Sequence, residues 1–358
     1  MRIFACMKTG FIKYSSWVII LLGLYACKST KFIPEGDYLL DRVRIESDIT
    51  GYKSMELKPY VRQQPNFKMF GLYKTMLQVY NLSGKDTTKW HNRFIRKIGE
   101  EPVIYDSILV AKTKNELRKL FVNMGYIHAE VSSETVFRNK KAQVFYRIQG
   151  NTPYRIRQYS VSVSDSTIAR DLYGNNGQPA EQIPGEAVSL HIPLIQEGWL
   201  FDRNRLDAER DRLTSLLQNR GYFEFTKENI TYDADSALNN HAVDLKLNMK
   251  IVNDSAVFSA DKKYFYDRVF LYLDYDPLRM SNLNDYSAEK SITHDRYTVF
   301  YTGEKPSLNL RTLFNNCFIV PGKQSSLIRE DFTYTSFSNL RALNNIQIQY
   351  NEKMRNDS

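Results

Sequence analysis

The sequence has little cysteine, and what it has is poorly placed for disulfide bonds. Among 358 residues there are three cysteines, Cys6, Cys27 and Cys317. Cys6 lies in an N-terminal segment that we expect to be removed, and a lipid-modified Cys27 could not pair with Cys317. We therefore expect no disulfide framework, and we interpret Cys317 as a small buried apolar residue.

The motifs of common enzyme and metal sites are also absent. No H-E-x-x-H, G-x-S-x-G, P-loop or G-x-G-x-x-G motif occurs. The histidines are too far apart in the sequence to suggest a local metal pair: His91, His128, His191, His241 and His294. We expect no catalytic residue, cofactor or metal ion, although an envelope enzyme assembled from distant residues stays open as an alternative.

Dense charge of one sign is lacking as well. The net charge is +9, but no block of five or six like charges appears, so nucleic-acid binding is permitted without being indicated. Acidic and basic residues alternate between residues 202 and 212, which is typical of a solvated helix face with paired charges. The acidic members are Asp202, Asp207, Glu209 and Asp211. With 42% hydrophobic residues, the chain can form two or three domains.

One apolar run stands near the N-terminus, and it is too short to span a bilayer. Trp17 to Ala26 follows the cations Arg2, Lys8 and Lys13 and fits the apolar region of a signal peptide over residues 1–26. The run ends in Leu24-Tyr25-Ala26-Cys27, which resembles a lipobox. We expect lipidation at Cys27; the alternative is an ordinary signal peptide with a coincidental cysteine.

A repeated phrase organises the rest of the chain. "LRKLFVNMGYIHAEV" from Leu117 returns 96 residues later as "LTSLLQNRGYFEFTK" from Leu213, and the alignment needs no gap over residues 105–126. Each copy has an apolar stripe at helical spacing, then a glycine, Gly125 or Gly221, where we expect the helix to stop at positive φ. We expect the first of these helices to begin at a capping box, Thr113 to Glu116.

Strands flank each predicted helix. Val144, Tyr146 and Ile148 alternate in the first copy, and Val243 to Met249 alternate in the second. A third, degenerate copy opens at Tyr264 to Asp276; we expect it to close with a short helix containing Leu340 and Leu343 and a strand over Ile346, Ile348 and Tyr350. Between residues 51 and 99 the first copy is enlarged by a basic, aromatic segment, which either packs on the sheet or contacts membrane headgroups or a partner.

Taken together, these motifs resemble a known family. The lipobox, "STKFIPEGDYLL", "LKPYVRQQPN", "IGEEPVIYD" and "PYRIRQYSV", with L-x-x-L-x-x-x-G-Y at the helix ends, are similar to the POTRA-domain region of the BamA/TamA (Omp85) outer-membrane assembly superfamily, in its lipoprotein TamL-like branch. The resemblance covers nearly all of Cys27 to Glu352. It implies an α+β tandem array of β-α-α-β-β domains at 27–151, 152–253 and 260–352, each a three-stranded mixed sheet with two helices on one face.

The resemblance also implies a place and a mode of action. The last strand of each sheet would be central and the second would form an edge, to which an extended client chain can add by backbone hydrogen bonds. That edge would run near Phe225, Ile230 and Tyr232 in the second copy and over Val131 to Phe137 in the first. The partners implied are unfolded outer-membrane polypeptides or a periplasmic or inner-membrane protein, and the protein would be lipid-anchored on the periplasmic side of the outer membrane.

The family continues into a β-barrel, for which the residues after Tyr350 are too few. We therefore expect a truncated product, a fragment or a stand-alone lipoprotein, and these alternatives stay open. A non-catalytic scaffolding protein and a glycan-binding or adhesion lipoprotein that uses the aromatics of Phe67 to Trp90 are the competing functions.

Overall fold

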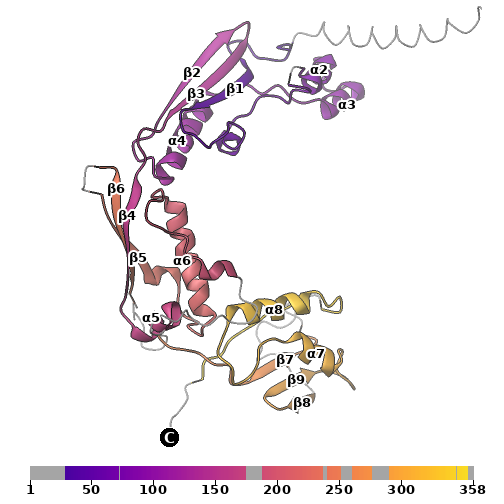
Figure 1. Ribbon diagram of the computed structural model, residues 1–358. Coiled ribbons are helices and arrows are strands. Elements are labelled where there is room, and N and C mark those ends of the chain that lie inside the picture. The colour runs from indigo at the N-terminus through magenta and orange to yellow at the C-terminus, as the bar shows by residue number, and fades with distance from the viewer. Residues whose placement is uncertain are drawn as a thin grey trace, which may run out of the picture. The chain divides into compact units, whose positions relative to one another are not determined.

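The protein forms two compact units, Met1–Tyr154 and Arg155–Ser358. The structure is a computed structural model (Figure 1). It describes residues 29–71, 73–174, 188–236, 240–250, 260–275, 290–343 and 345–353. Within these residues the first unit holds one three-stranded sheet and the second holds two, and helices accompany all three. The predicted α+β array of mixed sheets is thereby confirmed.

The first sheet consists of β1 (Leu39–Ser47), β2 (Glu130–Arg138) and β3 (Lys141–Gln149). Its order is β1-β3-β2, with β3 parallel to β1 and antiparallel to β2. The last strand is therefore central and the second lies at an edge, as the resemblance implied. Val144, Tyr146 and Ile148 are buried at alternate positions of β3, because a strand turns successive side chains to opposite faces.

The long helix α4 (Ser107–Asn123) packs on one face of this sheet. Leu117, Leu120 and Phe121 are buried in one cluster with the apolar side chains of β3. The helix stops before Gly125, whose φ of +98° is readily adopted only by glycine, as predicted.

The predicted start of α4 is wrong. The helix begins after Asp106, whose carboxylate accepts hydrogen bonds from the N–H groups of Ile108 (2.7 Å) and Leu109 (3.4 Å). Thr113 lies inside the helix, where its hydroxyl donates to the carbonyl of Leu109 (2.9 Å). An aspartate that accepts hydrogen bonds from the first free amides is a sufficient cap. The later Thr-x-x-Glu pattern therefore lies within the helix and does not cap it.

The enlarged region 51–99 contains a short 3-10 helix, η1 (Lys58–Tyr60), and two helices, α2 (Thr75–Leu82) and α3 (Trp90–Ile98). Leu57 and Val61, on either side of η1, belong to the main core under α4. The helices α2 and α3 contact each other as a hairpin.

The second sheet repeats the first. It consists of β4 (Arg155–Val163), β5 (Ile230–Asp235) and β6 (Ala242–Met249) in the order β4-β6-β5, again with the last strand central. The helices α5 (Ser166–Tyr173) and α6 (Arg203–Gln218) contribute to its core, and short 3-10 helices η2 (Val188–His191) and η3 (Lys227–Asn229) precede α6 and β5. Gly221 ends the α6 region at φ +87°.

The third sheet has the same pairing with a different order along the chain. It consists of β7 (Val269–Tyr272), β8 (Lys290–His294) and β9 (Tyr297–Tyr301), with β9 central. Both β8 and β9 precede the helices α7 (Leu310–Asn316) and α8 (Leu327–Ser338), whereas β2 and β5 follow their long helices.

The expected close of the third copy is therefore wrong in detail. Leu340 and Leu343 lie beyond the end of α8, and no strand forms within described residues 345–353. The hairpin of β8 and β9, which turns at Asp295 with φ +54°, supplies the central strand beside β7. Ile346 and Ile348 instead pack against the third core as partly buried side chains.

One backbone contact nevertheless recurs in all three copies. At the start of β1 and β4, and three residues before β7, an amide donates to the carbonyl of the residue three positions before the cap of α4, α6 or α8, and the preceding residue forms an isolated bridge. The amide–carbonyl pairs are Leu40–Val103 (2.8 Å), Ile156–Trp199 (2.8 Å) and Tyr266–Lys323 (2.9 Å), and the bridges are Leu39–Ile104, Arg155–Leu200 and Phe265–Gln324. α8 is thus the counterpart of α4 and α6.

Candidate functional site

The candidate site is the free edge of the first two sheets. β2 pairs with β3 and β5 pairs with β6, and neither strand has a second partner among the described residues. A strand at the edge of a sheet presents a row of backbone N–H and C=O groups that another extended chain can bind.

The opposite edges are less suited to receive a strand. β1 has an irregularity in register between Leu40 and Arg42, and β4 has one between Ile156 and Gln158. The start of each strand is also bridged by the loop before the long helix. Because bulges and covering loops are common ways to protect a sheet edge, β2 and β5 are the open edges of these two sheets.

β2 offers the longer open edge. Its nine residues pair with β3 without any shift in register, which corresponds to a strand of about 30 Å. It contains no proline, and Val136 and Phe137 are almost half exposed near its end. The ring of Phe137 contacts those of Tyr38 and Tyr105, with ring centres 4.4 Å and 5.3 Å apart. These two tyrosines form an aromatic border beside the edge.

The three residues predicted for the second edge lie close together but point inward. Ile230 opens β5 and Phe225 precedes it in the turn before η3, and both side chains are fully buried. Tyr232 lies on β5, where its hydroxyl donates to the carbonyl of Leu206 (3.2 Å) and burial raises its pKa. A client would therefore meet the backbone of β5 and its exposed positions, Thr231 and Asp233 to Asp235, and client binding at this edge stays a prediction.

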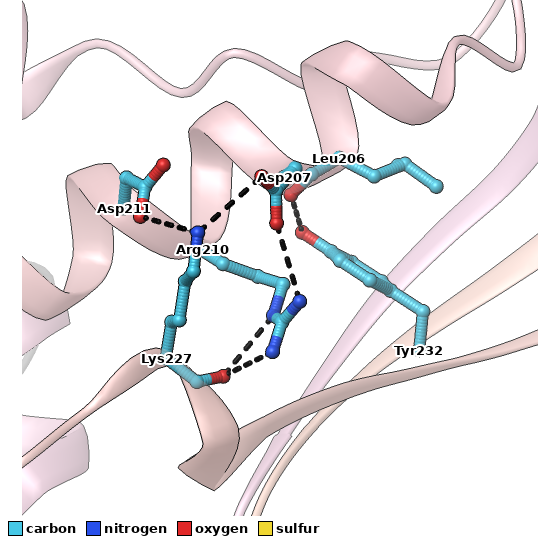
Figure 2. A network of polar contacts seen from close by, with 6 residues as sticks. All are labelled: Leu206, Asp207, Arg210, Asp211, Lys227 and Tyr232. Atoms are coloured by element: carbon cyan, nitrogen blue, oxygen red, sulfur yellow. Dashed lines mark hydrogen bonds and ion pairs between the residues drawn. The ribbon is translucent and has the colours of Figure 1, made fainter. Parts of the chain in front are cut away.

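A polar network fixes β5 to α6 (Figure 2). The Arg210 guanidinium donates to the carbonyl of Lys227 (2.6 and 3.1 Å) and to Asp207 (3.2 Å). The Lys227 ammonium in turn lies 3.4 Å from Asp207 and 3.2 Å from Asp211. Together with the bond from Tyr232 to Leu206, these contacts hold the start of β5 in one position. An edge that is already ordered would lose less entropy if a second strand were to add to it.

A buried polar position in the long helices was missed by the sequence reasoning. Seven residues after each cap, a buried side chain accepts a hydrogen bond from a backbone amide that precedes the helix. The pairs are Arg62 to Thr113 (3.0 Å), Leu194 to Glu209 (3.0 Å) and Phe318 to Thr333 (2.9 Å). The repeat offset of 96 aligns Thr113 with Glu209, so the sequence shows that the two residues share a position, although neither residue type indicates that it is buried.

The prediction of a solvated acidic face on α6 is accordingly wrong for Glu209. Asp207 and Asp211 are exposed, whereas Glu209 is 2% exposed and forms two hydrogen bonds with Arg212 (both 2.7 Å). The Arg212 guanidinium also donates to the carbonyl of Leu190. Asp202 is the cap of α6 and accepts from the amide of Asn204 (2.8 Å).

The remaining predictions concern the cysteines, metal sites and membrane spans. Cys317 is buried, and burial raises the pKa of its thiol, which suits an apolar packing role. Cys27 lies outside the described residues. Within the described ranges, no group of three or more His, Cys, Asp or Glu side chains could hold a metal ion, and no helix has the length and apolar character needed to cross a bilayer.

Among known proteins, similarity to this chain is found only with solved structures. No family model matches the sequence, and no curated protein does. The chain is similar to a crystal structure of Haemophilus influenzae BamA POTRA domains 3–5, at 11% identity and TM-score 0.37, covering 87% of this chain and 89% of that one. It is also similar to POTRA domains 1–2 of Omp85 from Anabaena, at 13% identity and TM-score 0.26, covering 61% of this chain and 99% of that one. A third similar structure is CdiB from Escherichia coli, at 8% identity and TM-score 0.22, covering 69% of this chain and 36% of that one.

Proposed function

We propose that this protein is a membrane-anchored, non-catalytic module of an outer-membrane protein assembly or translocation system. Its clients are unfolded outer-membrane polypeptides or a periplasmic or inner-membrane partner protein. A client segment adds as a new strand to β2 or β5, and backbone hydrogen bonds provide affinity with little demand on the client sequence.

One observation carries this proposal. The same edge is open in both sheets, while the opposite edge is irregular in register and bridged by a loop. An edge of a soluble protein is usually protected, because a regular open edge invites pairing with other chains. Its retention in two copies is expected of a surface whose role is to pair.

A crosslinking experiment tests the proposal with an internal control. In the first sheet, Ser132 of β2, Arg147 of β3 and Glu46 of β1 form one row, so Ser132 and Glu46 occupy equivalent places at opposite edges. Asp233 and Ser160 have the same relation across Lys246 in the second sheet. All four side chains are exposed. A photoreactive amino acid would be placed at each position in turn, and an unfolded outer-membrane β-barrel polypeptide would be added.

We expect adducts from positions 132 and 233 and little from positions 46 and 160. Equal yields from both edges would indicate non-specific association, and adducts from positions 46 and 160 alone would place the client on the wrong edge. Either result, or no adduct at any position, would overturn strand addition at β2 and β5.

Anchoring at Cys27 is part of the same proposal. The apolar run before Cys27 and the small residue Ala26 support its modification by lipid on the periplasmic side of the outer membrane. Cells fed a labelled fatty acid should incorporate it into the wild-type protein and not into the Cys27→Ser variant. Label retained in that variant would place the lipid elsewhere.

A further inference from the structure

The hairpin of α2 and α3 presents an apolar surface to solvent. On α3, Trp90, Phe94 and Ile98 follow one another at intervals of four residues, and their exposed fractions are 73%, 58% and 53%. The buried residue of this helix is polar, Asn92. A surface helix normally buries its apolar stripe and exposes its polar residues, so α3 has the reverse orientation.

Specific contacts hold α3 in this orientation. The Asn92 side chain donates to the carbonyl of Asp86 (2.7 Å) and accepts from the amide of Gly84 (2.8 Å). Arg96 donates to the Ser83 hydroxyl (3.1 Å) and to the carbonyl of Gly84 (3.0 Å). Because these bonds satisfy the loop between α2 and α3, rotating the apolar row inward would leave buried polar groups without partners.

A row of cations runs beside the apolar row. Lys89, Arg93 and Lys97 each precede a residue of the apolar row, and all three are exposed. No acidic side chain of the described residues forms an ion pair with them. The sequence from Asn66 to Gly99 has one acidic residue, Asp86, against seven basic ones: Lys68, Lys74, Lys85, Lys89, Arg93, Arg96 and Lys97.

The hairpin is attached to the part of the chain that follows Cys27. The Lys31 ammonium donates to the carbonyls of Asn81 and Ser83 (both 2.8 Å) at the end of α2. Ile33, Leu39 and Leu77 form a small buried cluster that joins α2 to the start of β1. The four residue-to-residue steps from Cys27 to Lys31 can extend over at most about 14 Å. A lipid at Cys27 would therefore hold the hairpin close to the bilayer.

We propose that the outer face of α3 is a docking surface for an anionic phospholipid bilayer. Trp90, Phe94 and Ile98 insert at the boundary between headgroups and acyl chains, and Lys89, Arg93 and Lys97 bind the phosphates. Aromatic and aliphatic residues beside Lys and Arg on one helix suit this interface, and the charge is complementary to an anionic surface. The proposal goes beyond the proposed function, because it requires no client binding.

Vesicle sedimentation tests this surface without help from the lipid anchor. The chain from residue 27 onward would carry Cys27→Ser, so that every described residue is kept and no acyl chain contributes. Phosphatidylcholine vesicles with and without a minority of phosphatidylglycerol would be compared. The cation-row variant (Lys89→Glu, Arg93→Glu, Lys97→Glu) should lower the partition coefficient by about 100-fold or more, since each cation near an anionic surface contributes roughly a factor of five. The apolar-row variant (Trp90→Ser, Phe94→Ser, Ile98→Ser) should also bind weakly.

A matched control separates position from net charge. Lys112→Glu, Lys114→Glu and Lys119→Glu change the same number of exposed cations on α4, and this variant should bind almost as the parent does. Equal loss in both charge variants, or no sedimentation of the parent, would overturn the proposal. So would a concentration-dependent dimer that the apolar-row variant abolishes, because the surface would then bind a second copy. Unchanged circular dichroism verifies that the variants fold.

Discussion

At the scale of single residues, the buried acceptor in each long helix joins the helix to the segment before it. Thr113, Glu209 and Thr333 are almost fully buried, and each side chain accepts a hydrogen bond from one backbone amide. Of the three, we expect Glu209 to affect stability most when it is removed, because it is charged and lies against Arg212, whose side chain is 9% exposed. A buried ion pair contributes little in itself, but removing one partner leaves the other charge uncompensated.

Removing this carboxylate should destabilise the second unit strongly. We expect Glu209→Ala to lower the free energy of unfolding by about 3–5 kcal/mol, since the buried Arg212 loses its carboxylate partner and the amide of Leu194 loses its acceptor. Asp211→Ala, at an exposed position on the same helix, should cost less than about 0.5 kcal/mol. Urea unfolding followed by circular dichroism measures both. Similar losses in the two variants would contradict the role given to Glu209.

Glu330 should make the third copy sensitive to pH. Burial raises the pKa of this carboxyl above its ordinary 4.5, although the Tyr266 hydroxyl donates to it (2.7 Å). As pH rises, Glu330 therefore loses its proton in the unfolded chain before it does so in the folded chain. The stability that protonated Glu330 contributes is complete below pH 4.5 and is lost as pH rises through the folded-state pKa. Measured from pH 4 to 8, the wild-type free energy of unfolding should fall relative to that of Glu330→Gln. Parallel curves would refute this.

These residues mark the limit of prediction from sequence at this scale. The ungapped repeat places Thr113 and Glu209 at one structural position, but neither residue type indicates burial. The arginines around Glu209 look the same in sequence whether they face water or a buried carboxylate. Only the path of the residues before α6, which brings the amide of Leu194 to Glu209, distinguishes the two cases.

At the scale of elements, local periodicity predicted more than local motifs did. The alternation of β3 and β6 and the glycines after α4 and α6 were correctly interpreted, because pleat and positive φ are local requirements. The start of α4 was missed, because Thr-x-x-Glu occurs within helices as well as at their ends. Asp106 and Asp202 align in the repeat, and both are caps in the structure.

The cap of α4 can be tested directly. Asp106→Ala removes the acceptor for the amides of Ile108 and Leu109 and should destabilise the first unit by about 1 kcal/mol. Asp106→Asn keeps an acceptor and should cost much less. Urea midpoints of the two variants give the comparison, and an Asp106→Ala midpoint equal to that of the wild type would show that the cap is not needed.

At the scale of the whole molecule, one sheet pattern is used three times with different surroundings. The first two copies place their second strand at the edge after the long helix, and the third forms its sheet from a hairpin before its helices. That difference was not predictable from residues 345–353, whose alternation is equally suited to a strand, because strand pairing depends on which distant segment lies beside β7. The function proposed for the chain therefore rests on the first two copies.

Backbone hydrogen exchange with and without an unfolded outer-membrane polypeptide tests the claim about these edges most directly. Strand addition predicts that amides of β2 and β5 exchange more slowly when the polypeptide is present, while those of β1 and β4 are unchanged. Slower exchange confined to β1 and β4, or to segments outside the sheets, would contradict the account, and so would the absence of any change at a polypeptide concentration that saturates binding.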